Sequence, residues 1–252
     1  MKRAVVVGLA LALVAASAGE AEAQKRKHRH DDDRGRSART GAYFTVSGIG
    51  AEPRGELVGF FDQGYGAEFA GAGPVALGGL VRLRGHVGFL NYGLERQSYC
   101  FALPIGCRIG VDLTTANNIF FGGVGPELAL TLGRLEPYAH WSAGFSYFVT
   151  TSSISGADDY GDDWGTTTHL SDFVTSRTAG MGVRIRLSDG RKPVSLDIGV
   201  EEHRNGVAEF LTEGDIVDHP DGSITLYPNL AEANLTAVKI GISIGIPRGR
   251  RR

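Results

Sequence analysis

A histidine and a serine two positions apart, His140 and Ser142, are the residues in this chain best placed to do chemistry. A histidine within reach of a serine hydroxyl can take its proton and leave the oxygen nucleophilic, as acyl-transfer sites require. Such a site also needs an acidic residue that orients the histidine, and the same strand offers no convincing one. The residues favour a histidine hydrogen-bonded near Glu127 over a catalytic base, so we predict no catalytic residue and no enzyme.

Two clusters could bind a metal ion. One is His28 and His30 followed by acidic residues at 31–33, and the other, within 151–170, comprises Asp158, Asp159, Asp162 and Asp163. Hard cations take several carboxylate oxygens, but the second cluster lacks the ordered spacing of an EF-hand loop. Charge runs of this kind are more often solvated surface. We therefore predict neither a metal site nor a cofactor.

These residues must be positioned by strands, because the central stretch 118–150 alternates with a period of two. Side chains of a strand point in turn to opposite faces. One face is apolar or small: Phe120, Gly122, Val124, Pro126, Leu128, Leu130 and Leu132, then Ala139, Trp141, Ala143, Phe145, Tyr147 and Val149. The polar face of the second strand carries His140 and Ser142. The stretch is predicted to be a long antiparallel hairpin with a tight turn at 133–136.

The same alternation predicts the other strands, at 41–50, 75–83, 86–95, 173–187, 194–201 and 238–246. Arg84 and Gly85 are expected to turn the chain, although a single long bent strand fits almost as well. The glycine-rich segment 52–73 is predicted as a long loop with some strand character. Eight strands result, with short turns near Arg84, Gly133 and Ser188 and long segments at 51–74, 96–117, 151–170 and 204–232.

The ends of the chain are predicted to lie outside this fold. Residues 1–23 combine a basic start, an uncharged apolar run and small residues at candidate cleavage sites, which indicates a secretory signal peptide. The run is shorter than the roughly 20 residues of a membrane helix. Residues 24–40 mix acids and bases without periodicity, so we expect a disordered charged linker. A basic tail, 247–252, ends the chain.

The composition argues against a helical protein and gives no support for a nucleic-acid-binding one. The 37 glycines disfavour a helical protein, and a net charge of -2 gives no reason to expect nucleic acid as a partner. Cys100 and Cys107 are the two cysteines, in a loop that contains proline and glycine. Export to an oxidising compartment would favour a disulfide between them, with two free thiols as the alternative.

The segments GGVGPELALTLGRLEPYAHWSAGFSYF and ANLTAVKIGISIGI resemble the strands of the small eight-stranded outer-membrane β-barrel proteins of double-membraned bacteria. The resemblance covers about 41–246. It implies an all-β, antiparallel up-and-down transmembrane barrel in the outer membrane, with short periplasmic turns and longer external loops. Outer-membrane lipid and the outer-membrane assembly machinery are the implied partners. One departure is that the last strand ends at Ile246 and is followed by PRGRRR, whereas many such proteins end in an aromatic residue that this machinery reads.

In such a barrel the alternation sorts the side chains into two sets. A charge on the lipid side costs roughly 2 to 4 kcal/mol at midplane for Arg or Lys, so the charged face must point inward. The predicted lumen network is Arg82, Arg84, Glu127, His140, Arg184, Arg186, Asp197, Glu201 and Lys239. The predicted lipid-facing residues are Leu128, Leu130, Trp141, Phe145, Tyr147, Val183, Ile185, Leu196, Ile198, Ile240, Ile242 and Ile244.

An eight-stranded barrel is just wide enough for side chains to fill it. We therefore favour a plugged barrel with a structural or surface-interaction role through its external loops, over a small conducting pore. Two further alternatives stay open. A secreted lipocalin-like barrel would reverse the faces and bind an apolar ligand inside. Outer-membrane lipid A deacylases carry a His-x-Ser pair, but His140 and Ser142 would point away from an acyl chain in the membrane. No residue identifies the surface ligand.

Overall fold

The computed structural model describes residues 41–103, 106–156, 163–190, 192–219 and 223–246, with the backbone alone described at 99–103, 106–110, 156 and 163–164. The predicted signal peptide, linker and basic tail lie outside these residues. So do the side chains of Cys100 and Cys107. The backbone register pairs Cys100 with Gly110 and Cys107 with Ala102, so the disulfide stays a prediction.

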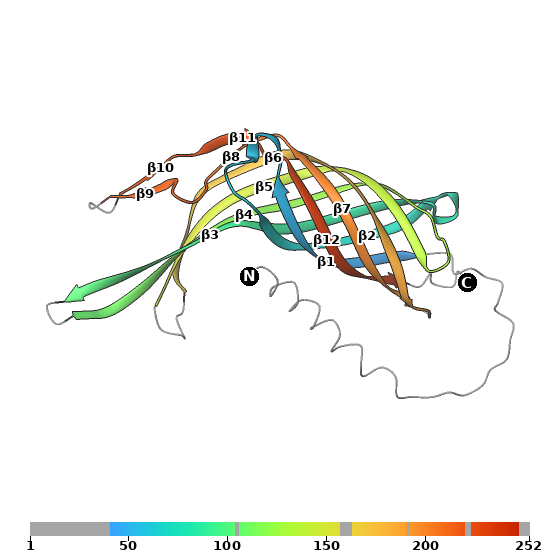
Figure 1. Ribbon diagram of the computed structural model, residues 1–252, viewed down its shortest axis with the longest axis horizontal. Coiled ribbons are helices and arrows are strands. Elements are labelled where there is room, and N and C mark those ends of the chain that lie inside the picture. Colours follow the sequence, from blue (N-terminus) through green and yellow to red (C-terminus); the bar gives the residue numbers. More distant parts are fainter. Residues whose placement is uncertain (1–40, 104–105, 157–162, 191, 220–222, 247–252) are drawn as a thin grey trace, which may run out of the picture. The chain divides into compact units, whose positions relative to one another are not determined.

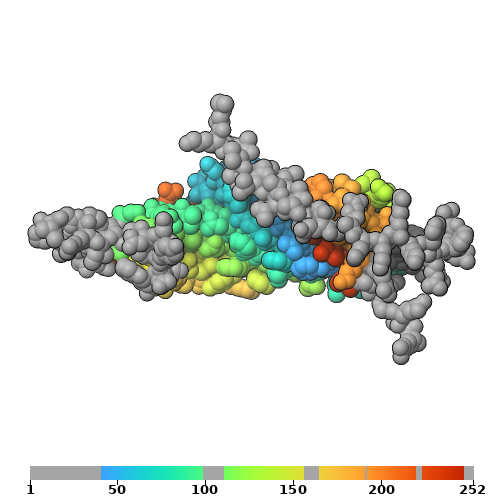
Figure 2. Space-filling model, turned by 90° about the horizontal axis from the view of Figure 1, so that it is seen from below, coloured from blue at the N-terminus to red at the C-terminus, as the bar shows by residue number. Residues whose placement is uncertain are grey.

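Eight strands form a closed antiparallel barrel in which each strand pairs with its neighbours along the chain (Figure 1). The barrel strands are β1 (Ala42–Pro53), β2 (Gly64–Ala76), β3 (Val81–Leu103), β4 (Gly106–Ala129), β5 (Leu135–Gly156), β6 (Asp163–Ser188), β7 (Val194–Asn205) and β12 (Leu235–Ile246). Pairing of β1 with β12 closes the wall, and the blue residues of β1 lie beside the red residues of β12 in Figure 2. The predicted all-β, eight-stranded, up-and-down barrel is confirmed.

The first half of the strand prediction is wrong in detail. Residues 64–73, predicted within a loop, belong to β2, and the turn expected at Arg84 is absent because Gly85 lies within the extended β3. The chain turns earlier, in the 3-10 helix η2 (Leu77–Gly79), where Gly78 and Gly79 have positive φ angles of 68° and 105°. Glycine adopts such angles without steric cost. The alternative of one long strand is therefore correct from Val81 onward, whereas residues 75–76 belong to β2.

Short and long connections lie at opposite ends of the barrel. Ala42 pairs with Ile246, so the start of β1 and the end of β12 share one end with the short turns after β2, β4 and β6. The predicted turns near Gly133 and Ser188 are confirmed. At the other end, the connection from β1 to β2 contains the 3-10 helix η1 (Gly55–Leu57). The connection from β7 to β12 contains β8 (Val207–Phe210), β9 (Ile216–Asp218), β10 (Ile224–Leu226) and β11 (Asn229–Glu232).

Two segments predicted as loops are largely strand. β2 leaves β3 after Asn91, whereas β3 and β4 stay paired as far as Leu103 and Gly106. On the other side, pairing of β6 with β7 ends at Ser176, whereas β5 and β6 continue together. Strands β3 to β6 therefore extend past the closed wall as one sheet, which Figure 1 shows to the left of the barrel. We call the described residues of this extension, 92–103, 106–117, 150–156 and 163–175, the external sheet.

The closed wall is apolar outside, and its lumen is polar near the short turns. Outward side chains such as Leu128, Trp141 and Ile240 are about half exposed, at 54%, 48% and 50%. Inward ones such as Arg184, Glu127 and Lys239 are at most 3% exposed. This polarity is the reverse of a lipocalin, so the lipocalin-like alternative is wrong. Among the described residues, no helix has the length and hydropathy to cross a bilayer.

Candidate functional site

Every barrel strand contributes to a buried group of charged and phenolic side chains in the lumen near the short turns. We call this group the ionic layer: Tyr43, Glu68, Arg82, Arg84, Glu127, Glu136, Tyr138, Arg184, Asp197, Glu201 and Lys239. Each member lies on the inward face of its strand because the pleat sends every second side chain to the axis. The layer holds five carboxylates and four cations that are buried and paired.

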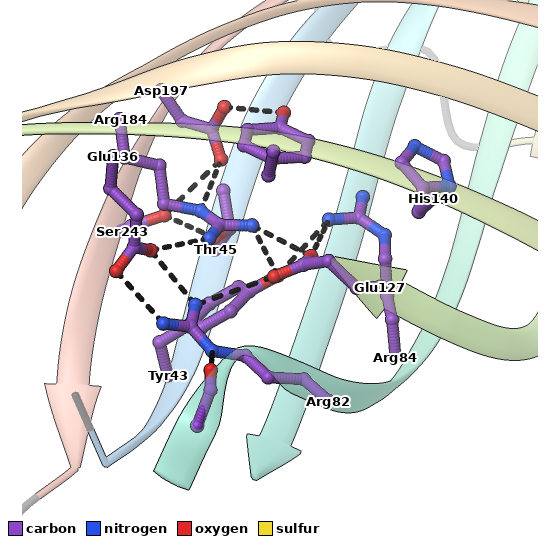
Figure 3. Close-up of polar contacts among 12 residues, drawn as sticks. Tyr43, Thr45, Arg82, Arg84, Glu127, Glu136, His140, Arg184, Asp197 and Ser243 are labelled. Atoms are coloured by element: carbon purple, nitrogen blue, oxygen red, sulfur yellow. Dashed lines mark hydrogen bonds and ion pairs between the residues drawn. The ribbon is translucent and has the colours of Figure 1, made fainter. Parts of the chain in front are cut away.

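Arg184 is the centre of the layer (Figure 3). Its Nη2 donates to Glu127 Oε2 and its Nη1 to Glu136 Oε1, each at 2.7 Å, and its Nε lies 3.3 Å from Asp197 Oδ2. A guanidinium offers five donors in a fixed plane, so one arginine can serve three carboxylates. This single side chain links strands β4, β5, β6 and β7.

Two aromatic rings, of Tyr43 on β1 and Tyr138 on β5, pack against the same guanidinium. The Arg184 Cζ lies 3.9 Å from the ring centre of Tyr43 and 4.0 Å from that of Tyr138. The Tyr43 hydroxyl donates to Glu127, and the Tyr138 hydroxyl donates to Asp197 at 2.7 Å. Cation–π contacts of this kind strengthen where water is excluded. The tyrosines thus complete the shell around the cation and also bring β1 into the network.

Arg82 closes the layer toward the short turns. Its Nη1 and Nη2 donate to the two oxygens of Glu136, both at 2.8 Å, and its Nε donates to the Gly79 carbonyl at 3.3 Å. The paired parallel hydrogen bonds are the strong bidentate form of an arginine–carboxylate contact. Arg82 therefore fastens β3 to β5 across β4.

Lys239 and Arg84 lie between two further carboxylates deeper in the lumen. Lys239 Nζ contacts Glu201 and lies 3.1 Å from Glu68 Oε1. Arg84 Nη2 lies 2.8 Å from Glu68 Oε1 and 3.5 Å from Glu201 Oε1. Burying a charge is costly unless it is paired, and here each of the four has more than one opposite charge at hand.

Three histidines lie next to this deeper part. His140 Nε2 is 2.9 Å from Glu201 Oε1, and His203 Nε2 is 3.5 Å from Glu201 Oε2. The predicted neighbour of His140, Glu127, is its partner in the backbone register, but the side-chain bond goes to Glu201 on β7 instead. His86 completes the set. Within the described part of the chain, no group of three His, Cys, Asp or Glu side chains is arranged to hold a metal ion.

Beyond the histidines the lumen is apolar. The apolar layer comprises Ile49, Ala51, Leu57, Leu90, Tyr92, Ile119, Phe121, Phe148, Val174, Ala208, Phe210, Ala231, Ala233, Leu235 and Ala237, with Phe60 and Phe61 packed against it. Several members come from the long connections and not from the wall. Leu57 belongs to η1 and Phe210 to β8, and their exposures are 0% and 1%. These residues of the connections fill the barrel mouth, and we call them the stopper: Leu57, Phe60, Phe61, Ala208, Phe210, Ala231 and Ala233.

Aromatic contacts join the two connections to each other and to β3. Phe60 meets Phe210 of the other connection edge to face at 5.2 Å between ring centres, and Phe61 lies 4.9 Å from Tyr92 of β3. The Tyr92 hydroxyl donates to the Leu211 carbonyl at 3.2 Å. Edge-to-face aromatic pairs add stability beyond the area that they bury. Nothing in the strand alternation predicted this layer, because residues 51–74 and 204–232 were assigned to external loops.

Two small cavities lie in the lumen. One, of about 30 Å³, lies at the short-turn mouth beside Arg134, Arg184 and Arg186. Another, of about 10 Å³, lies below the stopper beside His203 and mainly apolar neighbours. A water molecule needs about 10–15 Å³, so these two spaces are of the size of one or two waters and too small for a substrate.

Of the predicted lumen network, eight members lie in or directly beside the ionic layer: Arg82, Arg84, Glu127, His140, Arg184, Asp197, Glu201 and Lys239. Arg186 differs, because it sits at the mouth with a 19% exposed side chain, 3.8 Å from Asp189. All predicted lipid-facing residues are on the outward face and half-buried or exposed: Leu128, Leu130, Trp141, Phe145, Tyr147, Val183, Ile185, Leu196, Ile198, Ile240, Ile242 and Ile244.

Four side chains of the ionic layer were not predicted from the sequence. Glu68 lies in the segment assigned to a loop, and Glu136 was assigned to the turn before β5. Tyr43 and Tyr138 are aromatic residues on a polar face. The signal for Glu136 was present, because Glu136, Tyr138 and His140 are in phase along one strand. Glu68 had a weaker signal, since glycines interrupt the pattern on both sides of it.

The His140–Ser142 pair has no catalytic arrangement. Both side chains are buried in the lumen, on the face opposite the outward Trp141. Among the described residues the Ser142 hydroxyl has no hydrogen-bond partner, and His140 Nε2 is engaged by Glu201. A serine nucleophile needs its base within hydrogen-bond reach and room for the acyl group. Neither is present, so the geometry speaks against the deacylase alternative.

Comparison with known proteins gives structural matches alone: no family model and no curated protein sequence matches the chain. Ail, the attachment invasion locus protein of Yersinia pestis, is 10% identical with a TM-score of 0.42, over 82% of this chain and 99% of that one. Neisserial surface protein A is 11% identical (TM-score 0.36; 82% and 97%). A major outer membrane protein from Thermus thermophilus is 12% identical (TM-score 0.40; 81% and 99%). At these values the likeness indicates neither a shared ligand nor a shared activity.

Proposed function

We propose that this chain is a transmembrane barrel of the bacterial outer membrane that holds the external sheet at the cell surface for contact with other molecules, and that its lumen does not conduct. One observation carries the proposal: a closed wall whose outward side chains are apolar is continued by a sheet whose described side chains are mainly polar, with Leu94, Ile154 and Phe173 as its exposed large apolar residues. The wall suits hydrocarbon and the sheet suits water.

The polarity of the external sheet supports a position outside the bilayer. The register aligns Thr115, Ser152 and Thr167 across three strands, and the next row aligns Thr114, Ser153 and Thr166. Hydroxyl side chains in such rows are stable in water and costly in lipid. These rows lie beyond the last residues paired in the closed wall, Asn91 on β3 and Ser176 on β6, so they would lie outside the hydrocarbon.

The edge of the external sheet supports a role in interaction. Beyond Asn91 the described part of β3 pairs in the strand register with β4 alone, so β3 is an edge strand of the external sheet there. An unpaired strand edge is a template for a further strand from a partner. Glu95 and Arg96 are charges of the kind that keep such an edge from uncontrolled aggregation.

The filled lumen supports the absence of conduction. The ionic layer joins all eight strands in the half of the lumen near the short turns, and the apolar layer closes the mouth at the long connections. Purified protein in planar bilayers is expected to give no stable unitary currents. Reproducible channels would contradict the plugged lumen and favour the small pore.

Location and topology can be tested together. Membrane fractionation with heat-modifiable gel mobility should recover a folded barrel in the outer-membrane fraction. In a background with Cys100 and Cys107 replaced by serine, Ser98→Cys in the external sheet should react with a membrane-impermeant maleimide on intact cells. Ser188→Cys at the short-turn end should react only after permeabilisation. Recovery in a soluble fraction, or the opposite labelling pattern, would reject the proposal.

The role of the external sheet needs a variant that keeps the barrel. Replacing residues 95–115 with a short turn should leave insertion and heat-modifiable mobility unchanged. In a deletion strain this variant should fail to restore the phenotype of the lost gene, whereas the full chain restores it. Restoration by the trimmed chain would show that the sheet is dispensable. We also propose that Cys100 and Cys107 form a disulfide and that 1–23 is removed, which the mass of the mature protein with and without reductant would test.

A further inference from the structure

Two arginines break the apolar pattern of the outer wall. On β6 the outward positions are apolar at Val183, Met181 and Ala179 and then reach Arg177, which is exposed. On β7 they are apolar at Leu196, Ile198 and Val200 and then reach Glu202 and Arg204. Most strand charges of the closed wall point inward, and these two arginines, like Glu52 near the end of β1, point outward. Charges that face lipid are costly and mark functional positions when they persist.

The two arginines are direct neighbours across strands. The register pairs Arg177 with Arg204, which places two like charges side by side on the same outward face. Directly opposed like charges destabilise a sheet. Arg204 has Glu202 at 2.9 Å, with side chains 72% and 51% exposed, so this contact is worth little and leaves the trio with one net positive charge. Arg177 has no ion pair or hydrogen bond from its side chain in the described part of the chain.

The height of the pair matches the boundary between hydrocarbon and headgroups. Arg204 lies ten residues beyond Val194 on β7. At ~3.4 Å per residue this is ~34 Å along the strand, which a tilt of about 40° reduces to ~26 Å of height. The apolar band of an outer-membrane barrel is ~25 Å tall. The two guanidinium groups therefore sit where the phosphates of the external leaflet lie.

Aromatic side chains flank the pair on the neighbouring strands. Phe145 and Phe173 stack with ring centres 5.4 Å apart and an interplanar angle of 17°, just beyond Arg177 along β5 and β6. Trp141, on the opposite side, is 48% exposed. Aromatic residues gather at both interfaces of a membrane barrel. A headgroup at the arginines would have its acyl chains against the aliphatic wall below.

We propose that Arg177 and Arg204 form a binding site for the phosphate group of a membrane lipid in the external leaflet. Two adjacent guanidinium groups can each give parallel hydrogen bonds to phosphate oxygens, and the added negative charge relieves the repulsion between them. The inference rests on the membrane location proposed above. It goes further by naming a lipid site on the wall that is separate from the external sheet.

The test is lipid retention by the purified, folded chain in neutral detergent, measured by native mass spectrometry. The probes are lipid A with its phosphates, the same lipid after phosphatase treatment, and inorganic phosphate as a competitor. The variant is R177Q/R204Q. The matched control is R54Q/R96Q, which loses the same charge at exposed positions elsewhere on the surface.

Wild type and control are expected to bind phosphorylated lipid A at least tenfold more tightly than R177Q/R204Q, and all three should bind the dephosphorylated lipid equally weakly. Unchanged binding by R177Q/R204Q would overturn the proposal, as would equal wild-type binding of both lipids. Full displacement by inorganic phosphate at the same concentration would overturn the lipid assignment in favour of a free-oxyanion site. Heat-modifiable mobility checks folding, and if the double variant does not fold, R177Q alone must show the loss. Because the titration uses micelles, its failure is distinct from a failure of membrane location, which fractionation decides.

Discussion

The lower half of the lumen, near the short turns, is filled by five carboxylates and four cations. The upper half, near the long connections, is filled by aromatic and aliphatic side chains. The ionic layer draws a member from each of the eight wall strands, so it can form only when the barrel is closed. The apolar layer takes Leu57, Phe60 and Phe210 from the long connections. The first layer therefore braces the wall, and the second depends on segments that can in principle leave while the wall stays closed.

The two halves also differ in how they tolerate loss. A buried ionic network fails when one member goes, because its partners stay charged without compensation. An apolar layer loses transfer energy and gains a cavity, and the neighbours relax partly into the space. Variants in each half should distinguish the loss of charge compensation from the formation of a cavity.

Arg184→Met should have the largest effect. It removes the cation shared by Glu127, Glu136 and Asp197, and the expected loss of unfolding free energy is about 3–5 kcal/mol. Urea unfolding of the barrel in lipid vesicles measures it. Arg96→Met, at an exposed position of the external sheet, is the control and should change the free energy by about 0.5 kcal/mol or less. A loss below about 1 kcal/mol for Arg184→Met would show that the ionic layer does not brace the wall.

Phe210→Ala should cost about 3 kcal/mol, because its ring is 1% exposed and packs on Phe60. The damage should be local: limited proteolysis within 206–234 should accelerate, while amide protection of the lower strands persists. The exposed Val207→Ala on the same strand serves as the comparison and should leave the cleavage rate unchanged. Loss of protection in both halves at once would mean that the stopper and the wall unfold as one unit.

Arg82→Lys keeps the charge but removes the planar fork. Lysine cannot reproduce the two parallel 2.8 Å bonds to Glu136, so we expect about 2 kcal/mol of destabilisation. The same urea titration checks it, with Lys192→Arg at the exposed turn as the conservative exchange without effect. An unchanged unfolding free energy would indicate that charge alone, and not bidentate geometry, holds β3 to β5.

Ser142→Ala should have the smallest effect, within about 0.5 kcal/mol of wild type or slightly stabilising, because the buried hydroxyl has no partner among the described residues. Ser243→Ala is the matched case with partners: its hydroxyl contacts Thr45 and lies 3.3 Å from Asp197, and its loss should cost about 1 kcal/mol. Equal costs for the two serines would mean that Ser142 has a partner after all. Lipid A acylation should not change in either variant.

Much of the wall could be predicted because alternation along a strand reports directly which side faces what. Trp141 and His140 were assigned to opposite faces from their positions alone, and the structure separates them in the same way. Where glycines interrupt the pattern, as around Glu68, the prediction failed and β2 was taken for a loop. The count of eight was still reached, because a strand was missed at 64–73 and one was added by a turn wrongly placed at Arg84.

The partners within the site could not be predicted to the same extent. The inward direction of His140, Glu201 and Lys239 follows from the period of two, but their contacts depend on the stagger between strands that are far apart in the chain. A shift of two residues in one register would keep every face and change every pair. For this reason Glu127 was expected beside His140, whereas the closed barrel brings Glu201 there.

By itself, the sequence determined the two faces of the wall, the short turns at Gly133 and Ser188, and the inward position of the charges, since each depends on residues close together in the chain. Only the tertiary structure decided that Arg184 joins three carboxylates, that Leu57 and Phe210 enter the mouth, and that Arg177 meets Arg204 on the outer wall. These contacts join segments that lie far apart in the chain. They exist because closure of the sheet fixes the stagger of all eight strands at once, and no local pattern encodes that stagger.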